Sequence, residues 1–501
     1  MKKLAKIFIA ATLASSIGYG ASAEQLTILH TNDTHSQIDP ADDNLGGALR
    51  RKVVIDSVRS ANHNVLVVDA GDAVQGTLYF TLYNGEVEAK AMNLIGYDIA
   101  VMGNHEFDNG IDTLAKNIAS SNATWVSTNY DVTATPLDSL IVPYVIKEFG
   151  GKRIAFMGIN LDPKGMISSR NYPGMKFLDI FKAANSTAWS LRHNERADYV
   201  VAITHIGYDD PELADDLELA ANSEDIDLII GAHTHTLIDP NDSNAPKRIV
   251  KNLAGKDVII AQNGKMGKYV GEIKIDLDNL TTQSQLIRID SRLDSLIDKE
   301  AAAALAPYRS RVDSLLNIRV AKTKEALDQQ QLANLFGDII LQRGRQLAGR
   351  NVDFGLINNG GIRNDFPKGM VSEGHVMMTL PFNNYIEVVR IKGYDLEKIF
   401  NKMIERNING VSSNVEATYN TTTHRVNEVL INGKPLEQER TYTVATIDYL
   451  ANGGDYLKWF TNGEKIAASE NVLARDVINA LKREKRALAP DANPRIRPFT
   501  R

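Results

Sequence analysis

The stretch AVMGNHEFDNG, at residues 100–110, crowds polar residues at the end of a short apolar run. An amide, an imidazole and two carboxylates follow within five positions: Asn104, His105, Glu106 and Asp108. In α/β proteins, ligands bind beyond the carboxyl ends of the buried strands. A strand that ends in such a cluster therefore indicates a chemical site at one edge of a sheet.

Four other apolar runs end in the same way. The polar residues that follow them are Asp33 and His35 in LTILHTNDTH, Asp72 in VLVVDAGD, His205 in YVVAITH, and His233 and His235 in IDLIIGAHTH. Short β-branched runs separated by helical stretches predict an α/β fold. A single histidine after a strand is more often a hydrogen-bonded structural residue, but five such segments in order are hard to obtain from packing alone. They predict a metal site.

The types of donor restrict which metals fit this site. The chain has no cysteine, so any metal must be held by His, Asp, Glu or Asn. Oxygen and nitrogen donors without sulfur suit Mn, Fe, Mg or Zn. Asp33 and His35 are two positions apart, so an extended segment points both to the same side. The two carboxylate oxygens of Asp72 can bridge two cations.

Length and charge limit the class of protein. The 501 residues exceed one hydrophobic core and predict two domains. A formal net charge of −6, without a basic stripe, argues against a nucleic-acid polymer as partner. Lysines, an apolar run and the small residues Ala21, Ser22 and Ala23 predict a secretory signal over residues 1–23. We expect an exported protein, periplasmic or extracellular, that is not membrane-bound after cleavage.

Changes of composition along the chain predict its domain limits. Residues 24–289 alternate strand and helix patterns and are expected to form the first α/β domain. Residues 290–318 are charged and rich in Ala and Leu, and they predict a helical connector interrupted by Pro307. Residues 319–501 return to strand and helix patterns and are expected to form a second α/β domain.

The motifs, taken in order, resemble those of the calcineurin-like metallophosphoesterases: DTH (33–35), GD (71–72), GNHEFDNG (103–110), THIG (204–207) and GAHTH (231–235). GNHEFDNG resembles the motif of one branch of that family, the bacterial and extracellular 5′-nucleotidases and UDP-sugar hydrolases. In the second domain, NNGGIR (358–363), PFNN (381–384) and YLANGGD (449–455) look like its nucleotide-binding segments. The resemblance implies an N-terminal sandwich of sheets flanked by helices, a connector, and a C-terminal α/β nucleotide-binding domain.

The resemblance also implies two divalent metal ions, Zn, Mn or similar, with Asp72 as their bridge. One ion would be held by Asp33, His35, Asp72 and His235, and the other by Asp72, Asn104, His205 and His233. His105 would act on the phosphate in the transition state, and Asp108 would orient its ring and favour its cationic form. Glu106 and Phe107 are expected to be structural, the first at a helix start and the second in the core.

For the substrate, the resemblance implies a small-molecule nucleotide held by the second domain. Its expected contacts are Phe382 and Tyr449 on either side of the base, Asn384 and Asp455 on the base and the ribose hydroxyls, and Asn358 and Arg363 at the phosphate. Tyr449 stands where relatives commonly have Phe. The segment EALDQQQ (325–331) lacks an arginine that relatives carry, so the resemblance does not predict the preferred base or leaving group.

The function expected from the sequence is therefore that of an exported two-metal phosphohydrolase. It would release the 5′-phosphate of nucleoside monophosphates by in-line attack of a metal-activated hydroxide. UDP-sugars and 2′,3′-cyclic nucleotides are further expected substrates. Two alternatives stay open: a thiosulfohydrolase acting on a sulfur carrier protein, and a catalytically silent protein that binds nucleotide or metal. The sequence predicts no oligomeric state.

Overall fold

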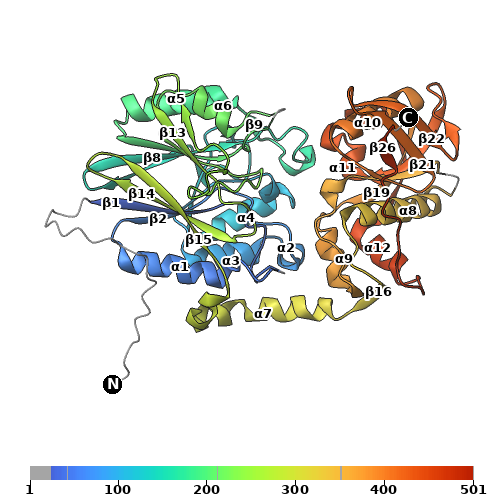
Figure 1. The fold of residues 1–501 in the computed structure, drawn as a ribbon, viewed down its shortest axis with the longest axis horizontal. Coiled ribbons are helices and arrows are strands. Elements are labelled where there is room, and N and C mark those ends of the chain that lie inside the picture. Colours follow the sequence, from blue (N-terminus) through green and yellow to red (C-terminus); the bar gives the residue numbers. More distant parts are fainter. Residues whose placement is uncertain (1–23, 42, 211–212, 350–351, 500–501) are drawn as a thin grey trace.

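The computed structural model describes residues 24–499 except 42, 211–212 and 350–351. The predicted secretory signal, residues 1–23, lies outside the described residues. Figure 1 shows two lobes side by side, with a long helix, α7 (Lys299–Leu316), running along their lower edge from one lobe to the other. Over the described part of the chain, no helix combines the length and apolar character that crossing a bilayer requires.

The N-terminal lobe contains two stacked sheets. The first has the order β15 (Thr282–Arg288), β14 (Tyr269–Asp276), β1 (Gln25–Thr31), β2 (Val65–Asp69), β3 (Ile99–Ala100), β4 (Thr124–Val126), β6 (Ile141–Val142). The second has the order β12 (Ile249–Lys251), β13 (Asp257–Ala261), β11 (Leu228–Ile230), β10 (Tyr199–His205), β8 (Lys152–Asn160), β7 (Tyr144–Phe149). A small ribbon joins β5 (Tyr130–Asp131) to β9 (Lys176–Phe177).

Helices cover the outer faces of this sandwich (Figure 1). Those packed on the first sheet are α1 (Ala48–Ala61), α2 (Leu78–Tyr83), α3 (Glu86–Ile95) and α4 (Ile111–Ser120), and those on the second are α5 (Ile180–His193) and α6 (Asp216–Ala221). In β1, Leu29 packs toward the helices while Ile28 packs between the sheets. Both faces are buried, which explains why these strands are continuous apolar runs. The predicted sandwich is confirmed.

Because neighbouring strands are parallel, the loops that follow them lie at the same edge of each sheet. β1, β2, β3 and β4 are parallel neighbours, and β8, β10, β11 and β13 are parallel neighbours in the second sheet. Parallel strands end at the same edge of a sheet, so the loops that follow β1, β2 and β3 meet, as do those that follow β10 and β11. The polar segments of the sequence lie in these loops.

The C-terminal lobe is also mixed α/β. Its main sheet has the order β20 (Gly410–Val411), β17 (Phe354–Ile357), β24 (Thr441–Ile447), β19 (Tyr385–Lys392), β25 (Glu464–Val472). Smaller sheets contain β23 (Lys434–Pro435), β22 (Arg425–Ile431), β21 (Val415–Asn420) and β26 (Ile496–Pro498), and β16 (Arg319–Thr323) with β18 (Gly369–Ser372). The helices are α8 (Gln329–Ala348), α9 (Glu373–Thr379), α10 (Gly393–Glu405), α11 (Asp448–Ala451) and α12 (Leu473–Leu481).

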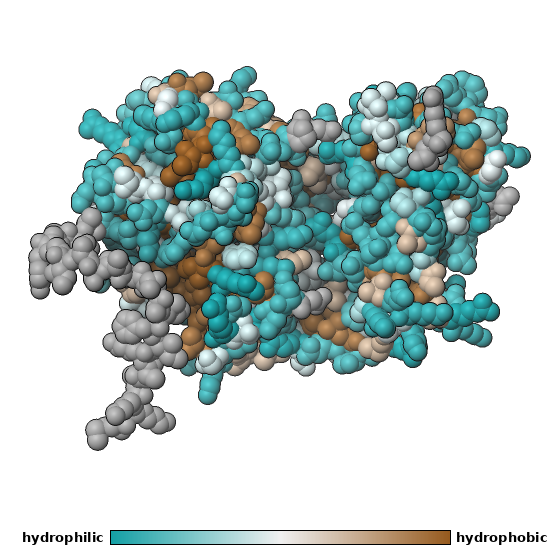
Figure 2. All heavy atoms as spheres, viewed as in Figure 1, coloured by the Kyte–Doolittle hydropathy of each residue, from teal (hydrophilic) through white to brown (hydrophobic). Residues whose placement is uncertain are grey.

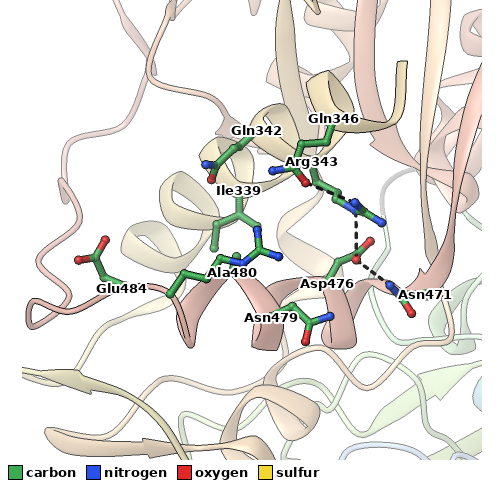
Figure 3. Close-up of a pocket in the computed structure, with 10 residues that line it drawn as sticks. Ile339, Gln342, Arg343, Gln346, Asn471, Asp476, Asn479, Ala480 and Glu484 are labelled. Atoms are coloured by element: carbon green, nitrogen blue, oxygen red, sulfur yellow. Dashed lines mark hydrogen bonds and ion pairs between the residues drawn. The ribbon is translucent and has the colours of Figure 1, made fainter. Parts of the chain in front are cut away.

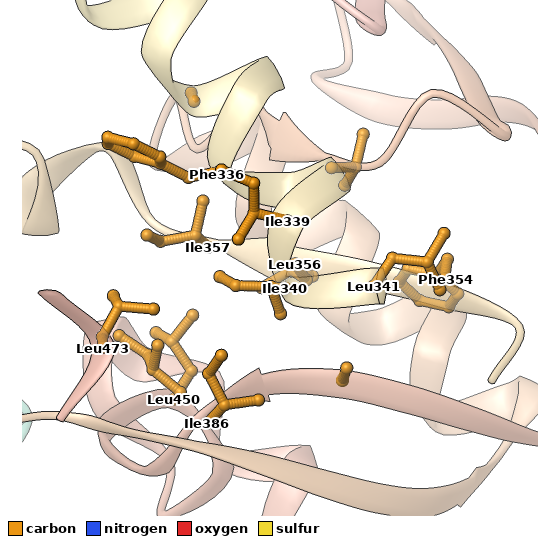
Figure 4. Packing of buried hydrophobic residues seen from close by; sticks show 14 of the residues in the cluster. Phe336, Ile339, Ile340, Leu341, Phe354, Leu356, Ile357, Ile386, Leu450 and Leu473 are labelled. Atoms are coloured by element: carbon orange, nitrogen blue, oxygen red, sulfur yellow. The ribbon is translucent and has the colours of Figure 1, made fainter. Parts of the chain in front are cut away.

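Helix α8 forms the centre of this second core. Its start is fixed by a capping box between Asp328 and Gln331. Figure 4 shows Phe336 and Ile340 of α8 close to Ile357 of β17, and all three side chains are fully buried. The lobe thus has its own hydrophobic core, separate from those of the sandwich.

The segment expected to be a connector is helical. It contains a short 3-10 helix, η3 (Ser291–Leu296), and α7, which Asp298 caps and within which Pro307 lies. Leu305 and Val312 of α7 are buried against the N-terminal lobe. The exact limits of 24–289, 290–318 and 319–501 stay a prediction. Figure 2 shows a mainly hydrophilic face that is hollowed between the lobes.

The buried ring of Phe107 provides a test of this packing. Phe107 is fully buried and packs on Tyr130, with ring centroids 6.0 Å apart. Phe107→Ala should lower the free energy of unfolding by about 3–5 kcal/mol, because it leaves a cavity beside the site loop. Urea denaturation followed by circular dichroism measures the change. The control is Phe499→Ala, at a ring that is 48% exposed; equal stability of the two variants would contradict the assignment.

Candidate dinuclear metal site

The loops after five strands bring the predicted metal ligands to one place. Asp33 and His35 follow β1, Asp72 follows β2, Asn104 follows β3, His205 ends β10, and His233 and His235 follow β11. Five of these seven residues have positive φ: Asp33 (48°), His35 (47°), Asp72 (54°), His233 (77°) and His235 (59°). A non-glycine residue in this region is strained, and such strain clusters at functional sites.

The first group consists of Asp33, His35 and His235. One ligand atom from each lies within 4.8 Å of those from the other two. The Nε2 atoms of His35 and His235 are 2.9 Å apart, and His235 Nε2 is 3.6 Å from Asp33 Oδ1. Burial raises the pKa of Asp33 to about 7 and lowers the pKa of His235 to about 3. The His235 ring is therefore neutral and keeps a lone pair, as metal ligation requires.

The second group consists of Asp72, His205 and His233, which satisfy the same 4.8 Å criterion. His205 Nδ1 is 2.8 Å from the Ala70 carbonyl and donates to it, so Nε2 faces Asp72 Oδ2 at 3.3 Å. Burial opposes protonation of His205, but the carboxylate of Asp72 outweighs it and raises the pKa of His205 to about 10. Burial lowers the pKa of His233 to about 4.

An unsatisfied buried atom tests whether these residues fit divalent metals. Asn104 Oδ1 is buried without a hydrogen-bond partner, and the Asn104 side chain belongs to the loop that follows β3. Leaving such an atom unpaired is costly. The two groups together offer carboxylates, imidazoles and a free amide oxygen, which suit cations that prefer nitrogen and oxygen. The residues fit a two-metal site; the bridging role of Asp72 stays a prediction.

Glu106 holds the two metal-site turns together. Its carboxylate accepts hydrogen bonds from the backbone N–H groups of Asp72 (3.0 Å), Ala73 (2.9 Å) and Gly103 (2.5 Å). A Cβ at Gly103 would lie 2.1 Å from Asp72 Oδ1, so the turn admits only glycine there. The sequence predicted a structural carboxylate, but nothing in it indicated a link between these two loops.

The predicted catalytic pair is in contact. His105 Nδ1 lies 2.9 Å from Asp108 Oδ2, and His105 Nε2 lies 4.0 Å from Asp72 Oδ2. Burial opposes protonation of His105, but Asp108 and Asp72 outweigh it and raise its pKa. The Nε2 edge of a readily protonated imidazole is therefore directed toward the metal-ligand residues.

A cavity of about 280 Å³ lies between the lobes and joins these groups. All six predicted substrate contacts line it: Asn358, Arg363, Phe382, Asn384, Tyr449 and Asp455. The N-terminal lobe contributes Asp72, Asn104, His105, Asp108, His233 and His235 to the lining of the same cavity. Residues that lie far apart in the chain thus enclose one space.

Within the cavity, side chains of the C-terminal lobe lie close to the predicted metal ligands and His105. Arg363 donates to Gln75 Oε1 at 3.3 Å, and its guanidinium lies 5.9 Å from the ring centroid of Phe382. The Phe382 ring is stacked on His105, with centroids 5.9 Å apart and an interplanar angle of 29°. Asn358, expected at the phosphate, donates to Asp455 Oδ2 at 2.7 Å, on the side expected for the ribose.

Two residues that the sequence did not single out also contribute. Arg170 and Asn171 line the cavity from the segment between β8 and β9. Arg170 pairs with the buried Asp448 at 2.7 Å across the lobes, and Asn171 donates to the carbonyl of Asp108 at 3.0 Å. They lie in a loop without a motif, so local sequence carries no signal of these distant partners.

A second cavity, of about 430 Å³, lies between α8 and α12 on the C-terminal lobe (Figure 3). Polar side chains that line this cavity pair with one another: Asp476 accepts from Asn471 at 3.1 Å and lies 3.2 Å from Arg343. No predicted site residue lines it. The chemistry is therefore expected in the smaller, interdomain cavity.

Comparison with known families agrees with this geometry. Residues 26–237 match the calcineurin-like phosphoesterases, and residues 309–462 match the 5′-nucleotidase C-terminal domain. The fold and the site thus define a metallophosphoesterase class of hydrolase that uses divalent metals. The chain belongs to the 5′-nucleotidase family of this class.

Individual relatives show how far the similarity extends. The chain is 30% identical to the 5′-nucleotidase precursor from Thermus thermophilus, over 95% of this chain and 100% of that one, with a TM-score of 0.83. It is 32% identical to the trifunctional nucleotide phosphoesterase protein YfkN of Bacillus subtilis, over 87% of this chain but only 32% of that protein. Mouse 5′-nucleotidase is 27% identical, over 87% of this chain and 84% of its own.

Removing a predicted ligand should lower metal content before it affects folding. His235→Ala is expected to reduce bound divalent metal from about two ions per chain, because the first group loses one of its three close ligand atoms. Metal analysis after dialysis against a weak chelator measures this loss, and circular dichroism checks the fold. His63→Ala, at an exposed histidine remote from both groups, is the control. Unchanged metal content in His235→Ala would contradict the ligand assignment.

Proposed function

We propose that this chain is an exported 5′-nucleotidase that releases the 5′-phosphate of nucleoside monophosphates with two divalent metals. The single observation that carries the proposal is the interdomain cavity, which is lined both by predicted metal ligands and by the aromatic side chains of Phe382 and Tyr449. A substrate with both a phosphate and an aromatic base can contact both sets of residues. Relatives known as 5′-nucleotidase and nucleotide phosphoesterase support the same substrate class.

The proposed metal ligands are those of the two groups, together with Asn104. When bound, two divalent ions activate water and neutralise charge on the phosphoryl oxygens. Asn104 is a neutral oxygen ligand, so it holds a cation without adding negative charge against an anionic substrate. Asp72 belongs to the second group, and its backbone carbonyl accepts from the N–H of His35 in the first group at 3.0 Å, so Asp72 is the proposed bridge.

His105 is proposed as the group that stabilises charge on the phosphate. Its Nδ1–H donates to Asp108, which fixes the ring so that Nε2 faces the metal-ligand residues. Burial opposes protonation of this ring, but Asp108 and Asp72 outweigh it and raise its pKa, which favours the cationic form. A cationic imidazole can donate to a phosphoryl oxygen and can deliver a proton to the leaving 5′-oxygen.

The remaining contacts are proposed for the rest of the substrate. Arg363 lies between Gln75 and Phe382, where a guanidinium can bind phosphate oxygens in a bidentate manner. Phe382 and Tyr449 are proposed to stack on the base, Asn384 to bind it, and Asn358 and Asp455 to bind the ribose side. Stacking of this kind contributes about 1–3 kcal/mol per base.

A substrate panel tests the function. Metal-reconstituted protein is expected to release phosphate from AMP and UMP, and a chelator should abolish this release. UDP-glucose and 2′,3′-cAMP test the wider range proposed, and a thiosulfate-charged carrier protein tests the thiosulfohydrolase alternative. Absence of phosphate release from every nucleotide, in protein that holds its metals, would overturn the proposal.

The role of His105 has its own test. His105→Ala should lower kcat by about 10²–10⁴-fold while the bound metal stays at the wild-type level, because His105 acts on the phosphate rather than on the cations. Steady-state kinetics with AMP and metal analysis give the two readouts. His193→Ala, at a half-exposed histidine of α5, is the matched control. Near-native turnover of His105→Ala would refute the assignment.

A further inference from the structure

The hydroxyl of Tyr449 has three hydrogen-bond partners. It lies 3.0 Å from the carbonyl oxygen of Gly165, which belongs to the N-terminal lobe, and 3.0 Å from Asp455 Oδ1. The backbone N–H of Asp455 donates to the same hydroxyl at 3.2 Å. One phenol oxygen therefore joins the predicted ribose-binding residue to the opposite lobe.

The number of protons limits what this hydroxyl can do. A phenol has one proton to donate, and here it has two acceptors at 3.0 Å, Gly165 O and Asp455 Oδ1. When the proton goes to Gly165, Asp455 Oδ1 is left free to accept from a ligand hydroxyl. The contact between the lobes thus decides how much of the Asp455 carboxylate is available.

Asp455 needs such support because its backbone is strained. Its φ is 50°, in the left-handed region, and the following Tyr456 has φ 60°. Its second oxygen, Oδ2, is already held by Asn358 at 2.7 Å. The Tyr449 ring is itself fixed, because it packs so close to Gly454 that a Cβ there would lie 2.5 Å from it. Ring, hydroxyl and carboxylate form one rigid unit at the wall of the cavity.

The N-terminal segment that meets this unit also reaches the predicted catalytic pair. Arg170, a few residues after Gly165, pairs at 2.7 Å with Asp448, the residue before Tyr449. The next residue, Asn171, donates to the carbonyl of Asp108 at 3.0 Å. A short segment of the first lobe therefore contacts both the nucleoside wall and the Asp108 turn.

We propose that the Tyr449 hydroxyl is a positioning group that sets Asp455 to accept hydrogen bonds from the ribose hydroxyls, and that it does so through its contact with the Gly165 carbonyl of the opposite lobe. This inference rests on the proposed function. It assigns to Tyr449 a role in selecting ribonucleotides that is separate from stacking on the base, because stacking requires only the ring. A phenylalanine at this position would keep the ring but remove the acceptor for the Asp455 N–H, so the strained Asp455 backbone would no longer be held in place and the selection would be lost.

The test compares AMP with 2′,3′-dideoxy-AMP, which lacks both ribose hydroxyls. The wild-type protein should favour AMP in kcat/KM, and Tyr449→Phe should reduce this preference about tenfold, the typical effect of a hydrogen bond to a charged group. A general loss of activity cancels in the ratio, whereas a positioning defect does not. Asp455→Ala should also reduce the ratio, and adding Tyr449→Phe to it should cause no further reduction.

Tyr442→Phe is the matched control, because its buried hydroxyl accepts from the Glu437 N–H at 2.8 Å, within the core of the same lobe. It should leave the ratio unchanged. An unchanged ratio in Tyr449→Phe, or equal hydrolysis of both nucleotides by the wild type, would overturn this inference alone. Hydrolysis of p-nitrophenyl phosphate without hydrolysis of AMP would instead overturn the proposed function, and this inference with it.

Discussion

The site depends on the hydrogen bonds that the carboxylate of Glu106 accepts. This carboxylate accepts hydrogen bonds from backbone groups on the loops after β2 and β3, and so fixes Asp72 relative to Asn104 and His105. The two loops approach so closely that only glycine fits at position 103. These hydrogen bonds and this close packing hold the predicted metal ligands in their strained backbone conformations.

The electrostatics of the site follow from this crowding. Carboxylates and imidazoles are buried together, so each shifts the proton affinity of the others: Asp72 and His205 stabilise one another as a charged pair, while His233 and His235 are driven neutral. A divalent cation held by this group would supply the positive charge that a proton on His205 otherwise provides. The same arrangement leaves His105, held by Asp108, as the imidazole that faces outward into the cavity.

The second lobe completes the cavity, and none of the described residues in the two candidate metal groups belongs to it. It has its own hydrophobic core around α8, and α7 joins it to the first lobe at one side. Contacts across the gap at the site are polar or aromatic, such as Arg170 with Asp448 and Phe382 with His105. A nucleotide between the lobes would replace parts of these contacts, which places substrate recognition and chemistry on different domains.

Local sequence alone determined the strands and the types of candidate metal ligand, because an apolar run followed by Asp, Asn or His is a short-range pattern. That these side chains come together follows from the parallel strands, which end at a common edge of the sheet. Local sequence also determined the family, which rests on motifs such as GNHEFDNG. Only the tertiary structure decided which residues far apart in sequence come into contact. Examples are the hydrogen bonds from the Asp72 N–H to Glu106, from Arg363 to Gln75 and from the Tyr449 hydroxyl to the Gly165 carbonyl. These contacts come from loops and from the docking of two lobes, and no periodicity or spacing in the chain encodes how two separately folded surfaces fit together.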